Sequence, residues 1–428
     1  MPPSFVLRSA TVLDSTGGFQ GPLDVHVEGG RVIGVGRGLP ALGALQVDCS
    51  GLWLMPGVFD CHNHVAASSL DLAELLRTPM TLWTLQAADN ARRSLEAGVT
   101  FIRDPGGIDA GFRTAVERGL VEAPRLQIAV VTLCQTGGHA DGFLAGLGLE
   151  ASADYAPPFA GRPAHLVDSP DAMRRAVREV LRAGADWVKL CATGGVLSAH
   201  DEGDVAELTV EEIGVAVFEA TRKGKAVMAH AFGGEGLDNA LHAGVRSIEH
   251  GLFLTEEQAA RMADAGCWLV PTLLILEEVV RFAKEGTLPA PAARKALELE
   301  PLLGEAVRIA REHGVKIAVG SDFVRRDQHG RNLEELPLLH RAGLTVEETL
   351  LAATASGAEL CGVATDYGRI APGAVFDALV LDEDPGDLSL FARPGAVTGV
   401  FKGGVPVVLH ERLAEAGLGR PPAPGQHG

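Results

Sequence analysis

The stretch GVFDCHNH, residues 57–64, joins a short apolar run to two histidines. In an extended strand alternate side chains point to the same side, so His62 and His64 can bind one metal ion together. Four later apolar runs carry a polar residue at or next to their end: DWVKL (186–190), KAVMAH (225–230), VRSIEH (245–250) and IAVGSD (317–322). These polar residues are Lys189, His230, His250 and Asp322. Each stands where a buried strand would emerge, which indicates an enzyme.

Near-continuous apolar runs alternate with helical segments through the middle of the chain. Such runs are typical of parallel strands that are covered on both faces. We expect eight strands, at 57–64, 99–104, 125–131, 186–191, 225–230, 245–250, 267–272 and 315–322. Eight strand–helix units predict an α/β fold, a (β/α)8 TIM barrel, in which catalytic residues lie at the C-terminal ends of the strands. All six polar residues occupy that position.

The segments between these strands carry helix-start signals. The expected starts are Ser169 as an N-cap before Pro170, and capping boxes at Thr209 with Glu212 and at Thr255 with Gln258. One insertion, residues 132–168, is long and rich in Gly, Pro and Ala. Because long loops in compact domains are usually functional or disordered, we expect it to form part of a lid over the barrel mouth.

Both ends of the chain differ from the middle in their residue pattern: short β-rich runs are separated by Gly and Pro. Residues 1–57 and 365–415 are therefore expected to form one small β-sandwich domain, and residues 58–364 the barrel. Residues 416–428 contain GRPPAPGQHG and are expected to be disordered.

Composition narrows the class of protein. The net charge of −18 opposes a nucleic-acid or anionic-membrane partner and leaves small molecules as the expected ligands. No apolar stretch approaches the ~20 residues that span a bilayer. The start, MPPSFVLRSATVLD, has no basic region followed by a hydrophobic one, so no secretory signal is expected. The six cysteines form no CxxC pair, which favours buried thiols and a cytoplasmic location.

Several motifs together resemble the metal-dependent amidohydrolase superfamily, and its subgroup of Xaa-Pro dipeptidases and imidazolonepropionase-like enzymes in particular. The motifs are GVFDCHNH (57–64), TGGHAD (136–141), VKLCATGGVLS (188–198), AHAFG (229–233), SIEHG (247–251), GSD (320–322) and HGRNLEEL (329–336). The resemblance covers essentially the whole chain, including the β domain. It implies a homo-oligomer.

The resemblance also implies a centre of two divalent metal ions. His62, His64 and Asp322 would hold one ion, and His230 and His250 the other. Lys189 would bridge them as a carbamate formed with CO2, because an ammonium group would be repelled by two cations. Imidazole and carboxylate suit zinc, the expected ion, and also manganese, iron, nickel or cobalt.

The expected reaction is hydrolysis of an amide or peptide C–N bond. Metal ions lower the pKa of bound water to about 7, and Asp322 would accept its proton and pass it to the leaving nitrogen. Asp322 and Lys189 are therefore the catalytic candidates. The expected substrates are dipeptides, N-acyl amino acids or mycotoxin-like amino-acid amides.

Two further positions concern the substrate. In the resembling subgroup a histidine at the position of His139 helps to bind substrate. Phe232 stands where those relatives often have a tyrosine, which puts strict Xaa-Pro specificity in doubt. A carbamate hydrolase therefore stays an alternative. So do a one-metal deaminase or cyclic-imidate hydrolase, which typically has HxxE after strand five, and a non-catalytic homologue, which would normally lack ligands.

Four other residues lie near strand ends and have less specific roles. Asp60 is expected to support the first strand, and Asp104 either orients a ligand histidine or forms a loop hydrogen bond. Arg325 and Arg326 follow strand eight closely enough to meet a substrate carboxylate, although surface arginines are commoner.

Overall fold

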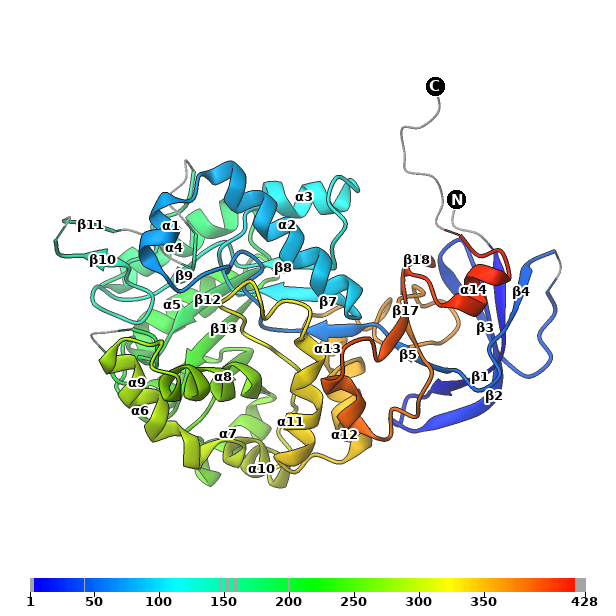
Figure 1. Cartoon of the computed structure of the whole chain (residues 1–428). Coiled ribbons are helices and arrows are strands. Elements are labelled where there is room, and N and C mark those ends of the chain that lie inside the picture. The colour runs from blue at the N-terminus through cyan, green and yellow to red at the C-terminus, as the bar shows by residue number, and fades with distance from the viewer. Residues whose placement is uncertain are drawn as a thin grey trace.

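Figure 1 shows a barrel surrounded by helices and, beside it, a smaller β domain that contains the described parts of both chain ends. The computed structural model describes residues 4–41, 43–146, 148–150, 154–156, 161–198 and 201–419. In the described part, no helix combines the length and the hydrophobicity that crossing a membrane requires.

The barrel strands follow the predicted order along the chain. They are β6 (Val58–Asp60), β7 (Val99–Asp104), β8 (Arg125–Ile128), β9 (Thr132–Leu133), β12 (Trp187–Cys191), β13 (Ala226–Ala231), β14 (Ser247–His250) and β15 (Trp268–Val270). They form two sheets, ordered β6-β7-β8 and β15-β14-β13-β12-β9, and all neighbours are parallel. The expected strand 125–131 is wrong in its second half, because the left-handed backbone of Val130 (φ 71°) separates β8 from β9.

The eighth expected strand, 315–322, forms only one isolated bridge, between Leu269 and Ile317, instead of a regular ladder. It nevertheless closes the barrel, because hydrogen bonds join it on both sides. Toward β15, the amide of Ala318 donates to the carbonyl of Leu269 (3.1 Å); toward β6, the amide of Cys61 donates to the carbonyl of Val319 (2.7 Å). The predicted fold class is confirmed.

Helices cover the outside of the barrel and part of its mouth. They are α1 (Leu72–Arg77), α2 (Met80–Glu96), α3 (Ala110–Glu117), α4 (Pro170–Arg182), α5 (Val210–Thr221), α6 (Gly234–Ala243), α7 (Glu256–Ala265), α8 (Leu273–Lys284), α9 (Ala290–Leu299), η1 (Glu300–Leu302), α10 (Glu305–Glu312), η2 (Asn332–Glu334), α11 (Glu335–Arg341), α12 (Val346–Ala352) and α13 (Ala355–Leu360). The three predicted helix starts are confirmed: Ser169 caps α4, and the boxes at Thr209 and Thr255 open α5 and α7. The hydroxyl caps satisfy amides that have no partner within the helix.

The β-sandwich domain is built from both chain ends, and hydrogen bonds connect its eight strands into one continuous sheet. Its strands are β1 (Phe5–Leu13), β2 (Phe19–Glu28), β3 (Arg31–Gly36), β4 (Leu45–Asp48), β5 (Trp53–Pro56), β16 (Ala378–Leu381), β17 (Val397–Lys402) and β18 (Val405–Val408). Two short helices accompany them: η3 (Leu388–Ala392) connects β16 to β17, and α14 (Glu411–Glu415) follows β18. The order is β18-β17-β16-β5-β1-β2-β3, with β4 also paired to β1. Antiparallel pairing of β5 with β16 joins the two ends. Phe5, Phe376 and Phe401 pack together in its core.

The expected domain limits and the expected tail have different outcomes. The limits of the β domain and barrel at residues 57 and 365 stay predictions. The disordered tail was expected from residue 416, but Leu418 is buried and its amide donates to the carbonyl of Leu413 (2.9 Å), so ordered structure continues past that point. Residues 420–428 of the expected tail lie outside the described residues.

The insertion 132–168 carries the hairpin of β10 (Phe143–Leu144) and β11 (Leu149–Glu150). Figure 1 shows this hairpin projecting from the body of the barrel. Residues 137–145 of the insertion line the cavity at the barrel mouth, as a lid segment would.

Candidate metal centre and active site

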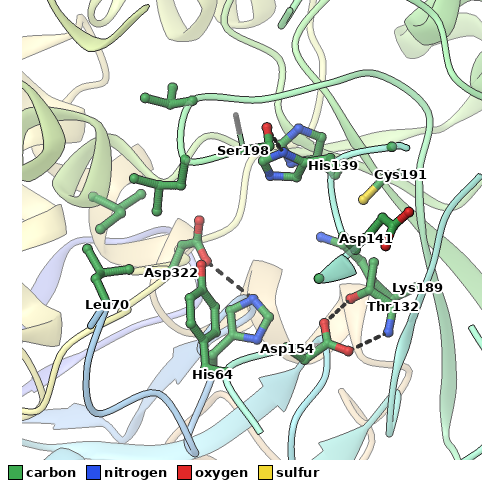
Figure 2. A pocket seen from close by; sticks show the side chains of 18 of the residues that line it. His64, Leu70, Thr132, His139, Asp141, Asp154, Lys189, Cys191, Ser198 and Asp322 are labelled. Carbon is green, nitrogen blue, oxygen red and sulfur yellow. Dashed lines mark hydrogen bonds and ion pairs between the residues drawn. The ribbon is translucent and has the colours of Figure 1, made fainter. Parts of the chain in front are cut away.

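The six strand-end residues predicted as ligands line one cavity of about 540 Å³ at the barrel mouth: His62, His64, Lys189, His230, His250 and Asp322. Figure 2 shows His64 and Asp322 facing each other, while His139 and Ser198 lie on another wall of the cavity. Side chains separated by up to 260 positions in the sequence therefore meet because parallel strands end at the same rim.

His62, His64 and Asp322 form the tightest cluster, with one ligand atom of each within 4.8 Å of the others. The Nε2 atoms of His62 and His64 lie 3.4 and 3.5 Å from Asp322 Oδ1. The other ring nitrogen of each histidine faces a protein acceptor, Glu249 Oε2 at 2.7 Å for His62 and the carbonyl of Gly106 at 2.9 Å for His64. Both Nδ1 atoms therefore act as donors, and both Nε2 lone pairs face Asp322.

A second group faces this cluster. The rings of His230 and His250 lie 4.6 Å apart between centroids. His230 Nε2 donates to the carbonyl of Gly194 (3.0 Å), which leaves the lone pair of its Nδ1 free to face a cation. His250 Nδ1 contacts the hydroxyl of Thr272 (2.6 Å), which leaves its Nε2. Lys189 is buried beside them.

Electrostatics favour an anion at Asp322 and neutral imidazoles at His230 and His250. Burial alone would raise the pKa of Asp322, but His62, His64 and Lys189 hold it at about 2. Burial lowers the pKa of His230 and His250 well below the usual range, and neighbouring histidines and Lys189 add to this effect. Burial also lowers the pKa of Lys189. A neutral amine is the form of lysine that reacts with CO2.

The backbone is strained where these ligands sit. His250 (φ 74°), Thr272 (φ 49°) and Asp322 (φ 51°) adopt the left-handed conformation that side chains other than Gly rarely adopt. Such strain costs about 1–3 kcal/mol per residue and persists where surrounding contacts enforce it. The amide of Asp322, for example, donates to the carbonyl of His62 (2.6 Å).

A buried ion pair behind His62 escaped the sequence interpretation. Arg103 and Glu249 are both fully buried, and Arg103 Nη2 donates to both carboxylate oxygens of Glu249 (2.9 and 3.0 Å). Burial alone would raise the pKa of Glu249, but Arg103 and His62 hold it at about 2. Glu249 therefore stays an acceptor that orients His62. The available signal was a charged residue in the interior of each of two short strand segments, Arg103 in VTFIRD and Glu249 in SIEH.

Asp60 and Asp104 hold backbone segments rather than ligand rings. Asp60 accepts hydrogen bonds from the hydroxyl of Ser321 (2.5 Å) and from Asn332 Nδ2 (2.8 Å), and so ties β6 to the segment that carries Asp322. Asp104 accepts from the amides of Val65 (2.9 Å) and Gly106 (2.9 Å). Of the two alternatives for Asp104, the structure has the loop hydrogen bond.

Both predicted substrate residues line the cavity. The ring of His139 stacks on His230 with centroids 4.3 Å apart, and the ring of Phe232 lies 5.0 Å from that of His230. Tyr155, which the sequence interpretation missed, also lines the cavity, edge-on to His64. The signal for it was modest: it is one of two tyrosines in the chain and falls in the 132–168 insertion.

Arg325 and Arg326 do not line the cavity. Arg325 pairs with Asp327 (3.1 Å), and Arg326 pairs with Asp89 (2.8 Å). Among the described residues that line the cavity, Lys189 is the only lysine and there is no arginine. The remaining wall is largely apolar, with contributions from Leu70, Leu72, Leu75, Val196, Leu197, Phe232, Ile275, Leu276 and Val279.

The donor set fits divalent cations. Imidazole nitrogens with free lone pairs and one carboxylate are suitable ligands for zinc and neighbouring transition metals. The ring nitrogens that do not face the cavity are fixed by hydrogen bonds, as is usual for histidines that bind metals.

Comparison with known proteins agrees with this chemistry. Residues 53–407 match the model of the Amidohydrolase family. Ochratoxinase from Aspergillus niger is 32% identical over 362 residues, which cover 82% of this chain and 75% of that protein. Among solved structures, a prolidase complexed with N-methylphosphonate-L-proline superposes with a TM-score of 0.87 at 33% identity, covering 94% of this chain and 99% of that one.

A Xaa-Pro dipeptidase with bound methionine superposes with a TM-score of 0.84 at 28% identity, again covering 94% and 99% of the two chains. The resemblance drawn from the motifs is confirmed. The chain belongs to the amidohydrolase family, and it is a hydrolase that acts on carbon–nitrogen bonds.

Proposed function

We propose that this protein is a metal-dependent amide hydrolase with two divalent ions, zinc in the first instance, that cleaves the C–N bond of a dipeptide or N-acyl amino acid. His62, His64 and Asp322 would hold one ion, and His230 and His250 the other. The observation that carries the proposal is the convergence of these residues with Lys189 on one cavity. The names of the related proteins, ochratoxinase and Xaa-Pro dipeptidase, support an amide or peptide substrate.

Lys189 would bridge the ions as a carbamate. Its neutral amine adds to CO2 with loss of one proton, which converts the uncharged side chain into an anionic carbamate. Burial of Lys189 and its lowered pKa support this step, because both favour the uncharged nucleophile. Reconstitution with metal should consequently require bicarbonate, and Lys189→Met should prevent it.

When bound, the ions would polarise the scissile carbonyl and lower the pKa of a water molecule. Asp322 accepts the proton of the attacking water and delivers it to the leaving nitrogen. Glu249 accepts the Nδ1 proton of His62 and keeps its Nε2 lone pair directed at the cavity. His139 and Tyr155 line the cavity and would hydrogen-bond the polar groups of the substrate, and the apolar wall would take its acyl group.

The test is a substrate screen combined with metal analysis. Purified protein loaded with zinc should contain two ions per chain and release amino acids from N-acyl amino acids or dipeptides. Asp322→Asn should lower kcat by about 10²–10⁴-fold, the usual contribution of a general acid–base. Asp327→Asn is the matched control, because Asp327 is exposed and pairs with Arg325 at the surface.

Other outcomes would identify the alternatives. Ammonia released from a heterocycle with one ion per chain would indicate a deaminase or cyclic-imidate hydrolase, and turnover of carbamates alone a carbamate hydrolase. Absence of metal and of all turnover would indicate a non-catalytic homologue. Each of these results would contradict the proposal.

The proposal includes a cytoplasmic location and a homo-oligomeric state. All six cysteines are buried and unpaired, which supports a reducing compartment. The oligomeric state rests on the family resemblance alone, and light scattering coupled to size-exclusion chromatography would measure it.

A further inference from the structure

A buried lysine on α9 donates hydrogen bonds to the backbone of a loop at the cavity wall. Lys295 is only 5% exposed. Its Nζ donates to the carbonyl oxygens of Gly195 (2.5 Å), Ser198 (2.8 Å) and Asp201 (3.0 Å), and to Asp201 Oδ1 (3.0 Å). An ammonium group has three protons, so these contacts use its full donor capacity. We call the held segment the Gly195 loop: Gly194 to Ser198 together with Asp201.

The Gly195 loop contacts two histidines of the active site. The carbonyl of Gly194 accepts from His230 Nε2 (3.0 Å). His139 Nδ1 contacts the hydroxyl of Ser198 (2.9 Å) and Asp201 Oδ2 (3.3 Å). Figure 2 shows His139 and Ser198 side by side at the cavity wall. The loop therefore fixes one nitrogen of each ring.

Close packing restricts His139 further. Its ring stacks on His230 on one face, with centroids 4.3 Å apart. Gly195 approaches so closely that a Cβ atom there would lie 2.3 Å from Cε1 of His139. A shift of Gly195 toward the ring would displace His139, and a shift away would release it. Because Lys295 donates to the carbonyl of Gly195, it fixes the position of this glycine.

We propose that Lys295 is a positioning residue of the hydrolytic site, which acts through Gly195, Ser198 and Asp201 to fix the imidazole of His139 against His230. This inference rests on the proposed function of the site. Lys295 touches neither substrate nor reacting atoms. Its loss removes one donor from the carbonyl oxygens of Gly195, Ser198 and Asp201 and a cation from beside the Asp201 carboxylate, so the loop must rearrange toward water.

The primary variant is Lys295→Met, which keeps the apolar stem and removes the charge. A displacement of about 1 Å in a catalytic group can cost roughly 100-fold in rate. We expect kcat/KM to fall by about 10–100-fold, mainly through a higher KM, with zinc content at saturating metal unchanged. Hydrogen–deuterium exchange should quicken in peptides that cover residues 194–201 and stay at the wild-type rate in β13 and β14.

Arg294→Gln is the matched control. Arg294 precedes Lys295 on α9 and also pairs with the neighbouring loop, through Glu202 (2.5 Å), but it is half exposed. Because exposed ion pairs contribute little, this variant should retain wild-type kinetics and exchange. Equal exchange and equal KM in the Lys295→Met and Arg294→Gln proteins would refute the positioning role.

Asp201→Asn keeps the test decisive if Lys295→Met does not fold. It should raise KM to a similar extent. Where Lys295→Met does fold, the double variant should be no worse than the single ones, because both changes disrupt the contact between Lys295 and Asp201. Additive losses would overturn the proposal. If the wild-type protein hydrolyses no amide, the proposed function fails, whereas the exchange comparison still decides whether Lys295 holds the loop.

Discussion

Individual side chains in this site are held by partners that lie far away in the sequence. Arg103 and Glu249, separated by 146 positions, form a buried ion pair that orients His62. The hydroxyl of Thr272, whose own backbone is left-handed, contacts Nδ1 of His250 and fixes its ring. Each of the four histidines proposed as ligands thus has one nitrogen fixed by the protein and one available for a cation, which is the arrangement that metal binding needs.

The buried carboxyl group of Glu207 predicts how the stability of the folded protein depends on pH. Its Oε1 accepts the amide of His139 (2.6 Å), while its Oε2 is buried without a partner among the described residues, and burial raises its pKa from 4.5 to about 8. Below pH 4.5 the carboxyl is protonated in both states. Above it the unfolded chain ionises first, so the native state loses roughly 3–5 kcal/mol of stability by pH 8.

Glu207→Gln should remove this loss, because the amide oxygen still accepts from His139 and carries no charge. Urea unfolding at pH 4.5, 6 and 8 measures the effect: the variant should gain on the wild type as the pH rises. Glu211→Gln, at an exposed position on α5, is the control. A constant difference between Glu207→Gln and wild type across this range would contradict the assignment.

Among the elements, the segment 315–322 does most to shape the site. It closes the barrel between β15 and β6 and delivers Asp322 beside His62. The fit is close at Gly320, where a Cβ atom would lie 2.5 Å from Val270 Cγ1 and 2.8 Å from His62 Cβ. Both neighbours are buried, so neither can move freely.

Gly320→Ala should therefore destabilise the protein by about 1–3 kcal/mol and weaken zinc binding, because the extra methyl group displaces His62. Thermal unfolding and zinc titration check the two effects. Gly214→Ala is the control, since a Cβ atom within α5 meets nothing within 4 Å. That helical substitution should stabilise by about 0.5–1 kcal/mol. Wild-type zinc affinity in Gly320→Ala would show that the contact with His62 is not tight.

At the scale of the whole molecule, the charge distribution predicts discrimination against substrates with an anionic acyl end. The net charge is −18, and the described residues of the cavity include no arginine and no lysine besides Lys189. N-butanoyl-leucine should therefore be hydrolysed at least about 10-fold faster in kcat/KM than N-succinyl-leucine, which has the same acyl length and one more carboxylate. The difference should shrink with added salt, because screening weakens long-range repulsion. Preference for the succinyl compound would contradict this.

The sequence alone determined the framework of this protein. Apolar runs that end on His, Lys or Asp predicted both a parallel barrel and the residues at its rim, because strand register and burial are local properties that a one-dimensional pattern records. Local hydrogen-bonding geometry likewise predicted the helix starts at Ser169, Thr209 and Thr255.

Only the tertiary structure decided what holds that rim in place. Three contacts join residues from different elements: Arg103 pairs with Glu249, Lys295 donates to the Gly195 loop, and Tyr155 packs against His64. No spacing in the sequence links such residues, since their contact depends on how the barrel closes and how α9 folds over its mouth. The sequence therefore specifies which groups can do the chemistry, whereas packing decides their orientation.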